Sequence, residues 1–181
     1  MSDDTPWLTP EQTYRWMHVV AASSALPTAI EHQLKRDAGL NFFEYSVLSG
    51  LSQAPERAMK MCELAMFSHG SPSRLSHAVS RMERAGWVQR RSCMEGPLRS
   101  VEAVLTDAGY DKIVEAAPAH VREARRLVVD ALTEQELQQL QHALRKILRV
   151  ASPPLLDVID ASFANAHPTA DAHDTEPTGL C

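Results

Sequence analysis

Hydrophobic positions recur along most of the chain at the three- and four-residue spacing of amphipathic helices. The pattern predicts helices over residues 10–37, 42–52, 61–67, 72–85, 107–132 and 134–150. Two shorter stretches, residues 87–91 and 101–105, favour strands and flank a turn at Glu95-Gly96-Pro97. The expected fold class is therefore mainly α, with a small two-stranded wing that directly follows a helix-turn-helix unit.

Capping residues mark several of these helix starts. Thr9-Pro10 and Ser71-Pro72 each place a capping hydroxyl before a proline at the first helical position. Residues 133–136 form a capping box at the start of the last amphipathic helix. Pro27 lies inside the first predicted helix, and we expect it to kink or split that helix.

The helix predicted over residues 72–85 has two contrasting faces. One face is apolar and should pack on the core; it holds Leu75, Ala78, Val79 and Met82. The other face holds Ser73, Arg74, Ser76, His77, Ser80, Arg81 and Arg84. Small hydroxyls let a helix approach a DNA groove closely, and arginine can bind guanine edges with two hydrogen bonds. This face predicts a DNA-recognition helix, although a surface helix with incidental charge is the alternative.

The net charge of −5 is unevenly distributed along the chain. No lysine or arginine follows Arg149, while five acidic residues do. By contrast, residues 57–99 hold eight basic and three acidic side chains. Such a run is usually a solvated face. Next to the predicted recognition helix it also fits the electrostatic footprint of a protein that binds a phosphate backbone.

The composition and motifs exclude several classes of protein. The seven glycines are too scattered for a dinucleotide loop or a P-loop, and no hydrolase elbow or zinc-protease motif occurs. We therefore expect no enzyme and no cofactor, and the spacing of the eight histidines predicts no metal site. Three cysteines, an acidic N-terminus and the lack of a long apolar run favour a cytoplasmic protein with no membrane contact.

An ordered set of motifs resembles the MarR family of bacterial winged helix-turn-helix transcriptional regulators. The set comprises MKMCELA at residues 59–65, GSPSRLS at 70–76, VSRMERAGWV at 79–88, the arginine pair at 90–91 and AVLTDAG at 103–109. The resemblance covers roughly residues 10–149. It implies a homodimer with intertwined terminal helices, a recognition helix in the major groove and a wing that reaches toward the minor groove.

The resemblance also assigns expected roles to individual residues. DNA contacts are expected for Ser71, Ser73, Arg74 and His77, for Arg81 on the same helical face, and for Arg91 and Arg99 in the wing. In the family, an aspartate two residues before the wing arginine usually holds it. This chain has Pro97 there, so it lacks the aspartate that usually holds the wing arginine.

The expected domain organisation has three parts: a flexible N-terminus over residues 1–9, a MarR-like domain over 10–150, and a mostly disordered acidic tail over 151–181. Within the domain, residues 42–106 form the winged helix, and residues 10–37 and 107–149 form dimerisation helices. The last two helices offer more apolar surface than a small winged helix needs, which favours a second copy as cover. A two-fold dimer requires double-stranded DNA with a pseudo-palindromic operator. Residues 155–163 are compatible with a short additional helix.

A small-molecule effector is a further expected partner, because members of the resembled family bind aromatic or phenolic ligands between the dimer layer and the winged helix. The candidate lining residues are Trp16, His18, His32, Phe42 and Tyr45. Each is also compatible with an ordinary core or surface role. Cys93 in the wing and Cys62 near a helix start are candidates for redox regulation, with passive roles as the alternative. The function predicted from sequence is a dimeric DNA-binding regulator, most consistent with a repressor released by a ligand or by oxidation. The alternative is a winged-helix protein-interaction module without DNA binding.

Overall fold

The computed structural model describes residues 5–95 and 98–166, with side chains described outside 93–99 and 165–166. The helices are α1 (Pro10–Ala38), α2 (Phe42–Gln53), α3 (Met61–Phe67), α4 (Pro72–Arg84), α5 (Asp107–Ala124), α6 (Glu134–Ala151) and α7 (Pro153–Ala166). The strands are β1 (Ala58–Lys60), β2 (Val88–Glu95) and β3 (Leu98–Leu105). Two short turns complete the order: η1 (Pro55–Arg57), of 3-10 type, and η2 (Arg125–Val129), a π-helical turn between α5 and α6.

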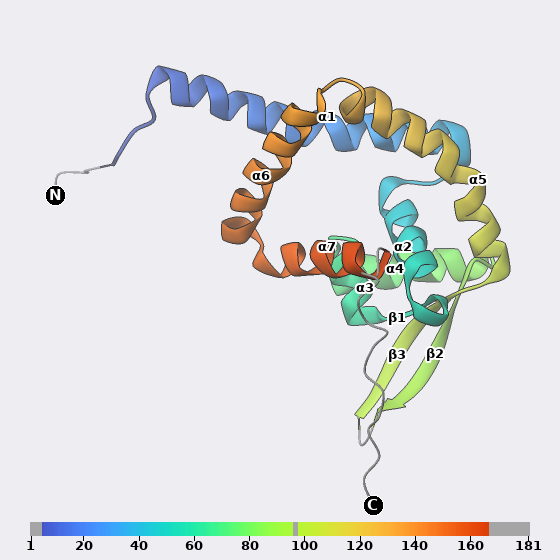
Figure 1. The fold of residues 1–181 in the computed structure, drawn as a ribbon. Coiled ribbons are helices and arrows are strands. Elements are labelled where there is room, and N and C mark those ends of the chain that lie inside the picture. The colour runs from blue at the N-terminus through green and yellow to red at the C-terminus, as the bar shows by residue number, and fades with distance from the viewer. Residues whose placement is uncertain (1–4, 96–97, 167–181) are drawn as a thin grey trace, which may run out of the picture.

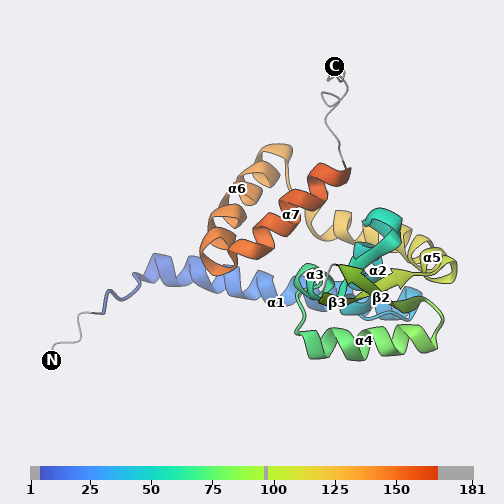
Figure 2. The ribbon, with the colours of Figure 1, turned by 90° about the horizontal axis from the view of Figure 1, so that it is seen from below.

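The elements form two parts. We call α2, α3, α4 and the sheet the winged-helix lobe, and α1, α5, η2 and α6 the helical layer. Figure 1 shows α1 and α5 running along one edge of the molecule, α6 turning away from them, and α7 returning toward the lobe. Figure 2 shows α4 on the side of the lobe opposite α6 and α7. The predicted fold class, mainly helical with a small wing, is confirmed.

The helix starts follow the capping signals in the sequence. Thr9 and Thr133 each form a full capping box, and the Ser71 and Thr106 hydroxyls each accept a hydrogen bond from a backbone N–H in the first turn. Asn41 forms a further capping box at α2. Such caps satisfy N–H groups that have no partner within the helix. Local sequence alone therefore fixes where these helices begin.

The core of the lobe consists of apolar side chains from the lobe itself, from the C-terminal end of α1 and from α5. Its fully buried side chains include Leu48, Leu64 and Leu75, with no solvent exposure. All four residues predicted for the inner face of α4 are buried. Gly109, in the first turn of α5, packs so closely that a Cβ there would lie 2.1 Å from the Trp87 carbonyl oxygen. Only glycine allows α5 to begin at this distance from the base of the wing.

The wing is part of a three-stranded antiparallel sheet with the order β1-β3-β2. Its register pairs Val88 with Leu105 at the base and Glu95 with Leu98 at the tip. The sequence pattern indicated two shorter strands and missed β1 entirely. Three residues are too few to show a period-two alternation, so only pairing with β3 identifies that strand.

Of the two effects predicted for Pro27, a kink or a split, the split is wrong, because α1 continues through Pro27 without a break. Hydroxyls around the proline add hydrogen bonds to carbonyls one turn earlier: Ser23 to Val19, Ser24 to Val20 and Thr28 to Ser24. One missing backbone bond is tolerated where the helix is long on both sides. Conversely, the helix predicted over residues 107–132 ends at Ala124 and passes into η2.

The prediction of a mostly disordered tail over residues 151–181 covers too many residues. Residues 153–166 form α7 rather than a disordered segment, and the helix is longer than the stretch 155–163 suggested by the sequence. The helix packs against α6 and α3, and the sequence of the tail alone does not predict these contacts. The rest of the tail, residues 167–181, lies outside the described residues. Within the described parts of the chain, no helix is long and apolar enough to cross a membrane.

Candidate nucleic-acid interface

The N-terminus of α4 is exposed and carries the residues expected to contact DNA. Ser71 caps the helix, and its Oγ accepts a hydrogen bond from the Arg74 backbone N–H at 3.2 Å. Ser73, Arg74 and His77 are all exposed. A helix N-terminus presents free N–H groups and a partial positive charge, so this end of α4 suits a phosphate group.

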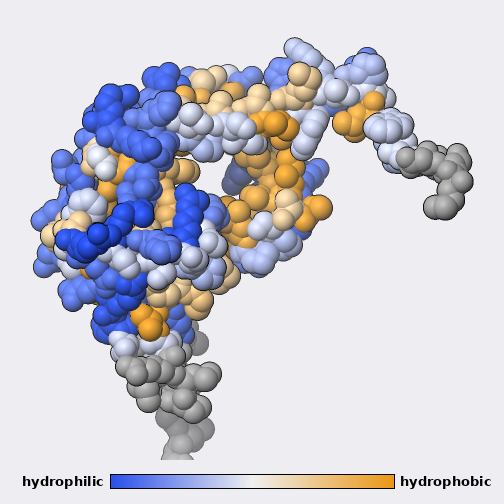
Figure 3. All heavy atoms as spheres, turned by 180° about the vertical axis from the view of Figure 1, so that it is seen from behind, coloured by the Kyte–Doolittle hydropathy of each residue, from blue (hydrophilic) through white to orange (hydrophobic). Residues whose placement is uncertain are grey.

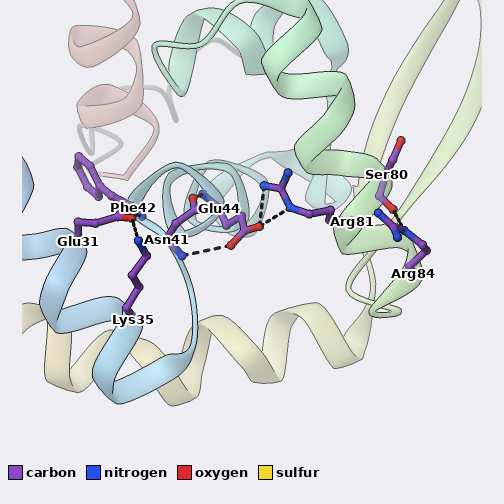
Figure 4. Close-up of polar contacts among 8 residues, drawn as sticks. All are labelled: Glu31, Lys35, Asn41, Phe42, Glu44, Ser80, Arg81 and Arg84. Atoms are coloured by element: carbon purple, nitrogen blue, oxygen red, sulfur yellow. Dashed lines mark hydrogen bonds and ion pairs between the residues drawn. The ribbon is translucent and has the colours of Figure 1, made fainter.

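Arg74 and Arg84 lie at opposite ends of the exposed face of α4. The guanidinium carbon of Arg74 lies 4.2 Å from the centre of the Phe43 ring, which holds the side chain on the surface of α2. Arg84 donates from Nε to the Ser80 carbonyl oxygen at 3.2 Å (Figure 4). Among the described side chains, no carboxylate lies within ion-pair distance of either guanidinium. Both are therefore available to an anionic partner.

Arg81, in contrast, is bound within the lobe. Its Nε and Nη2 donate to one carboxylate oxygen of Glu44, at 3.0 and 2.9 Å. The other oxygen of Glu44 accepts the Asn41 backbone N–H at 3.1 Å, as part of the α2 capping box (Figure 4). The network ties α4 to the start of α2. A role of Arg81 in DNA contact stays a prediction, and any such contact would compete with Glu44.

The start of α2 is fixed from the other side by α1. The Glu31 carboxylate accepts the Phe42 backbone N–H at 2.6 Å and pairs with Lys35 at 2.7 Å (Figure 4). Partial burial raises the pKa of Glu31, but the hydrogen bonds from Lys35 and Phe42 outweigh it, so the pKa lies below its usual value. Glu31 therefore stays ionised and holds α1 against the lobe.

Arg90, which the sequence analysis counted as positive charge and as part of a family motif, fastens the wing to α4. Its guanidinium pairs with Glu83 and donates to the Ser76 carbonyl oxygen at 2.9 Å and to the Ser80 hydroxyl at 3.2 Å. Its backbone N–H donates to Glu83 at 3.1 Å. We call this set the Arg90 clamp. It fixes the orientation of the wing relative to the exposed face of α4, and no local sequence signal predicts it.

The remaining basic residues at the base of the wing are largely neutralised. Arg91 pairs with Glu102 on the adjacent strand at 2.9 Å, and Arg57 pairs with Asp107 at 3.1 Å. Among the described arginine side chains of residues 57–99, Arg74 and Arg84 on α4 are thus the ones with no carboxylate within 4 Å. Arg99 and Cys93 belong to β3 and β2, but their side chains lie outside the described residues. Cys62 is an exposed free thiol in the first turn of α3.

The five effector candidates do not lie together in one chain. Trp16 and His18 are exposed on the N-terminal half of α1, where His18 packs edge-on against Tyr14 at 4.5 Å, and His32 is exposed further along α1. Phe42 and Tyr45, however, line one cavity of about 330 Å³ between α2, α3 and α7. The structure thus brings two of the five candidates together.

His120, which sequence reasoning did not single out, packs beside Tyr45. The two ring centres are 4.3 Å apart. Burial lowers the pKa of His120 and raises the pKa of Tyr45, so both are neutral near neutral pH. The His120 Nδ1 atom is buried and has no hydrogen-bond partner among the described residues. A lone histidine in a helix carries no sequence signal of this kind.

The helical layer exposes apolar side chains that the lobe does not cover. On α6 no residue is buried, and Leu140, Leu144 and Ile147 are 39%, 46% and 47% exposed. The N-terminal half of α1 exposes Trp16 and other large apolar residues. Figure 3 shows hydrophobic surface along the α6 arm and near the free end of α1. Among the described residues, no group of three or more His, Cys, Asp or Glu is placed to hold a metal ion.

Comparisons with known proteins agree with this geometry. The MarR family model matches residues 40–95. The chain is 36% identical to Sco3205, a MarR family regulator from Streptomyces coelicolor solved in complex with DNA; the match covers 84% of this chain and 94% of Sco3205, with a TM-score of 0.78. AbsC from the same organism is 34% identical, over 80% of this chain and 97% of AbsC, with a TM-score of 0.75.

A curated relative gives the same result over a shorter span. PecS, an HTH-type transcriptional regulator from Dickeya dadantii (strain 3937), is 36% identical over 75 residues, which is 41% of this chain and 44% of PecS. The chain therefore spans less than half of PecS in this match. Because the match to Sco3205 extends over nearly the whole of that protein, the chain belongs to the MarR family of transcriptional regulators.

Proposed function

We propose that this protein is a homodimeric transcriptional repressor that reads a pseudo-palindromic operator with α4 and releases it when a small aromatic or phenolic molecule binds. The observation that carries the proposal is the exposed face of α4. Arg74 and Arg84 are exposed there and have no carboxylate within 4 Å among the described side chains, and Arg74 lies close to the helix N-terminus capped by Ser71. This combination suits phosphate and guanine contacts in a major groove.

The exposed apolar face of α6 supports the dimer. Leu144 and Ile147 are about half exposed in one chain, although their helix is clearly amphipathic. A contiguous apolar surface of this kind marks an interface. Two copies related by a two-fold axis would present two α4 helices to half-sites about one helical turn apart, ~10 bp. The operator should therefore be a pseudo-palindrome.

The cavity lined by Phe42 and Tyr45 supports the effector. The rings of Phe42, Tyr45 and Phe67 line it together with Ser46, Ser49 and His69. Apolar walls with a few polar groups suit a small aromatic molecule that carries a hydroxyl. Oxidation at the exposed Cys62 is the other route to release that the sequence suggested. The interaction-module alternative predicts no specific DNA binding, and the cationic face of α4 disfavours it.

The test is DNA binding by the full chain. Purified protein is titrated with the DNA upstream of its own gene and with an unrelated duplex, at ~50 to ~200 mM salt. Arg74→Ala and Arg84→Ala should each weaken specific binding by about tenfold or more, since a good base contact is worth ~1–3 kcal/mol. Arg125→Ala, which removes one charge from η2 in the helical layer, serves as the matched control and should change affinity less than about twofold.

The outcomes separate the two functions. Preferential binding to the upstream DNA that is lost in Arg74→Ala supports the regulator. Selection of bound fragments from random-sequence DNA finds the operator if it lies elsewhere. Equal, weak binding to every duplex, with no sequence enriched by the selection, contradicts the proposal and favours the interaction module.

A further inference from the structure

The helix α7 lies between the two parts of the molecule and contacts both of them, α6 on one part and α3 on the other. Leu155, Val158 and Ser162 line the cavity shared with α2 and α3. Leu156 lines the groove along α6, and Ile159 lines both the cavity and the groove. At about 100° per residue these five positions lie on one continuous side of α7, with Leu156 at one edge and Val158 at the other. α7 is thus built to contact α6 and the lobe at the same time.

An ion pair fixes α7 to α6. Arg145 donates from Nη1 and Nη2 to the two carboxylate oxygens of Asp160, at 2.5 and 2.8 Å. This two-point geometry fixes the orientation of both side chains as well as their distance. The hydrogen bonds from Arg145 hold the pKa of Asp160 below its usual value, so the pair stays charged at neutral pH. Leu156, which is only 6% exposed, packs beside it in the same groove.

Near its N-terminus, α7 lies beside the segment that leads into the recognition helix. Leu155 and Pro154 line a cavity together with His69 and Gly70, which immediately precede the Ser71 cap of α4. In the described chain, α7 makes extensive backbone contacts with α6 and with α3. The extensive backbone contacts of α6 within the described chain are with α7. α7 is therefore the main packed connection between α6 and the turn before α4 (Figure 1).

We infer that α7 is a built-in strap that couples the position of the dimerisation helix α6 to that of the recognition helix α4. The inference rests on the proposed function, because it concerns how two α4 helices are held for one operator. A docked strap fixes the spacing of α4 relative to the dimer layer before DNA binds. Preorganisation of this kind strengthens binding by reducing the ordering that binding requires. Release of α7 lets α6 move relative to the turn before α4 and weakens binding to two half-sites far more than to one.

The test breaks and restores the ion pair in the full chain. The variants are Arg145→Asp, Asp160→Arg and the double exchange of both residues, with Val158→Asp on the lobe-facing side as an independent way to undock α7. Asp157→Arg is the matched control, since it makes the same charge change at an exposed position of α7 that pairs with no described side chain within 4 Å. Amide hydrogen exchange of α7 and of residues 68–71 measures docking without DNA.

Binding is then measured to the selected operator and to a duplex with one half-site, with the dimer checked by sedimentation. Each single variant should speed exchange in α7 and weaken operator binding about threefold to fivefold, as expected for a surface ion pair. Half-site binding should change less than about twofold. The double exchange should restore both readouts, and Asp157→Arg should change neither.

The strap and the proposed function fail in different ways. Faster exchange in α7 with unchanged operator affinity overturns the coupling and leaves the regulator intact. Unchanged exchange in every single variant overturns the strap itself. A wild-type protein that prefers no DNA sequence overturns the proposed function and with it the inferred coupling to DNA. The exchange data still show in that case whether α7 holds residues 68–71 in place.

Discussion

The winged-helix lobe and the helical layer use similar amphipathic helices but differ in how completely one chain buries them. In the lobe, Leu48, Leu64 and Leu75 have no solvent exposure. On α6, with an equally clear apolar stripe, Leu144 and Ile147 remain about half exposed. The lobe completes its own core, whereas α6 presents a face that only another surface can cover. An apolar stripe therefore predicts burial, but it does not say whether the cover comes from the same chain.

Truncation of a lobe core residue should have the largest effect. Leu48→Ala removes a fully buried side chain and should lower the free energy of unfolding by about 2–5 kcal/mol. Leu144→Ala on α6 is the contrasting variant and should lower it far less at concentrations where the protein is monomeric. Chemical denaturation at two protein concentrations measures both. Equal losses at low concentration would contradict the distinction between the two parts.

A charge on the exposed α6 face should dissociate the dimer. Ile147→Asp places a carboxylate where we expect apolar contact with a second copy, which should weaken dimerisation by tenfold or more, or about 1.4 kcal/mol and above. Analytical ultracentrifugation gives the dissociation constant directly. Lys146→Gln, on the neighbouring exposed position, changes the charge by the same amount and is the control. A fully dimeric Ile147→Asp protein would show that the interface lies elsewhere.

Loss of the Arg90 clamp should loosen the wing without unfolding the lobe. Arg90→Ala removes the pair with Glu83 and the bonds to Ser76 and Ser80, which should destabilise the fold by about 1–2 kcal/mol. Because the wing is then free to move relative to α4, specific DNA binding should fall by more than the stability loss explains. Arg90→Lys keeps the charge but not the forked geometry, so it should restore binding only in part. Unchanged specific DNA binding by Arg90→Ala, measured under conditions where the variant is fully folded, would contradict the clamp.

Acidification should produce the smallest effect, through His120. Burial lowers the pKa of His120 in the folded protein, while in the unfolded chain it is near the ordinary value of about 6.5. The unfolded state therefore takes up the proton first as the pH falls below about 6.5. The stabilising contribution is complete above that pH and is lost progressively down through the folded pKa.

Thermal melts at about pH 7.5 and pH 5.5 test this dependence. The melting temperature of the wild type should fall on acidification, and His120→Phe should reduce the fall. His142→Gln, at an exposed position on α6, is the control and should leave the fall unchanged. An identical pH dependence in His120→Phe and wild type would show that other groups account for it.

The recognition helix shows how much of the site follows from sequence. Ser71-Pro72 marks its start, and the spacing of Leu75, Val79 and Met82 correctly identifies its buried face. Both signals are local, because they depend on residues within one or two helical turns. The same reasoning treats Arg74 and Arg81 alike. In the folded chain Arg81 is bound by Glu44, 37 residues away in sequence, whereas Arg74 lies on the Phe43 ring with no carboxylate within 4 Å among the described side chains.

The sequence by itself determined the helix starts, the apolar faces and the family, because capping, periodicity and ordered motifs are properties of short stretches of chain. Only the tertiary structure decided which arginines are available, how Arg90 fixes the wing, that Tyr45 meets His120, and that α7 docks between α6 and the lobe. Those features depend on pairs of residues 7 to 75 positions apart, such as Arg90 with Glu83 and Tyr45 with His120. Electrostatic partners and packing neighbours of this kind are selected by the folded geometry, which composition and spacing do not encode.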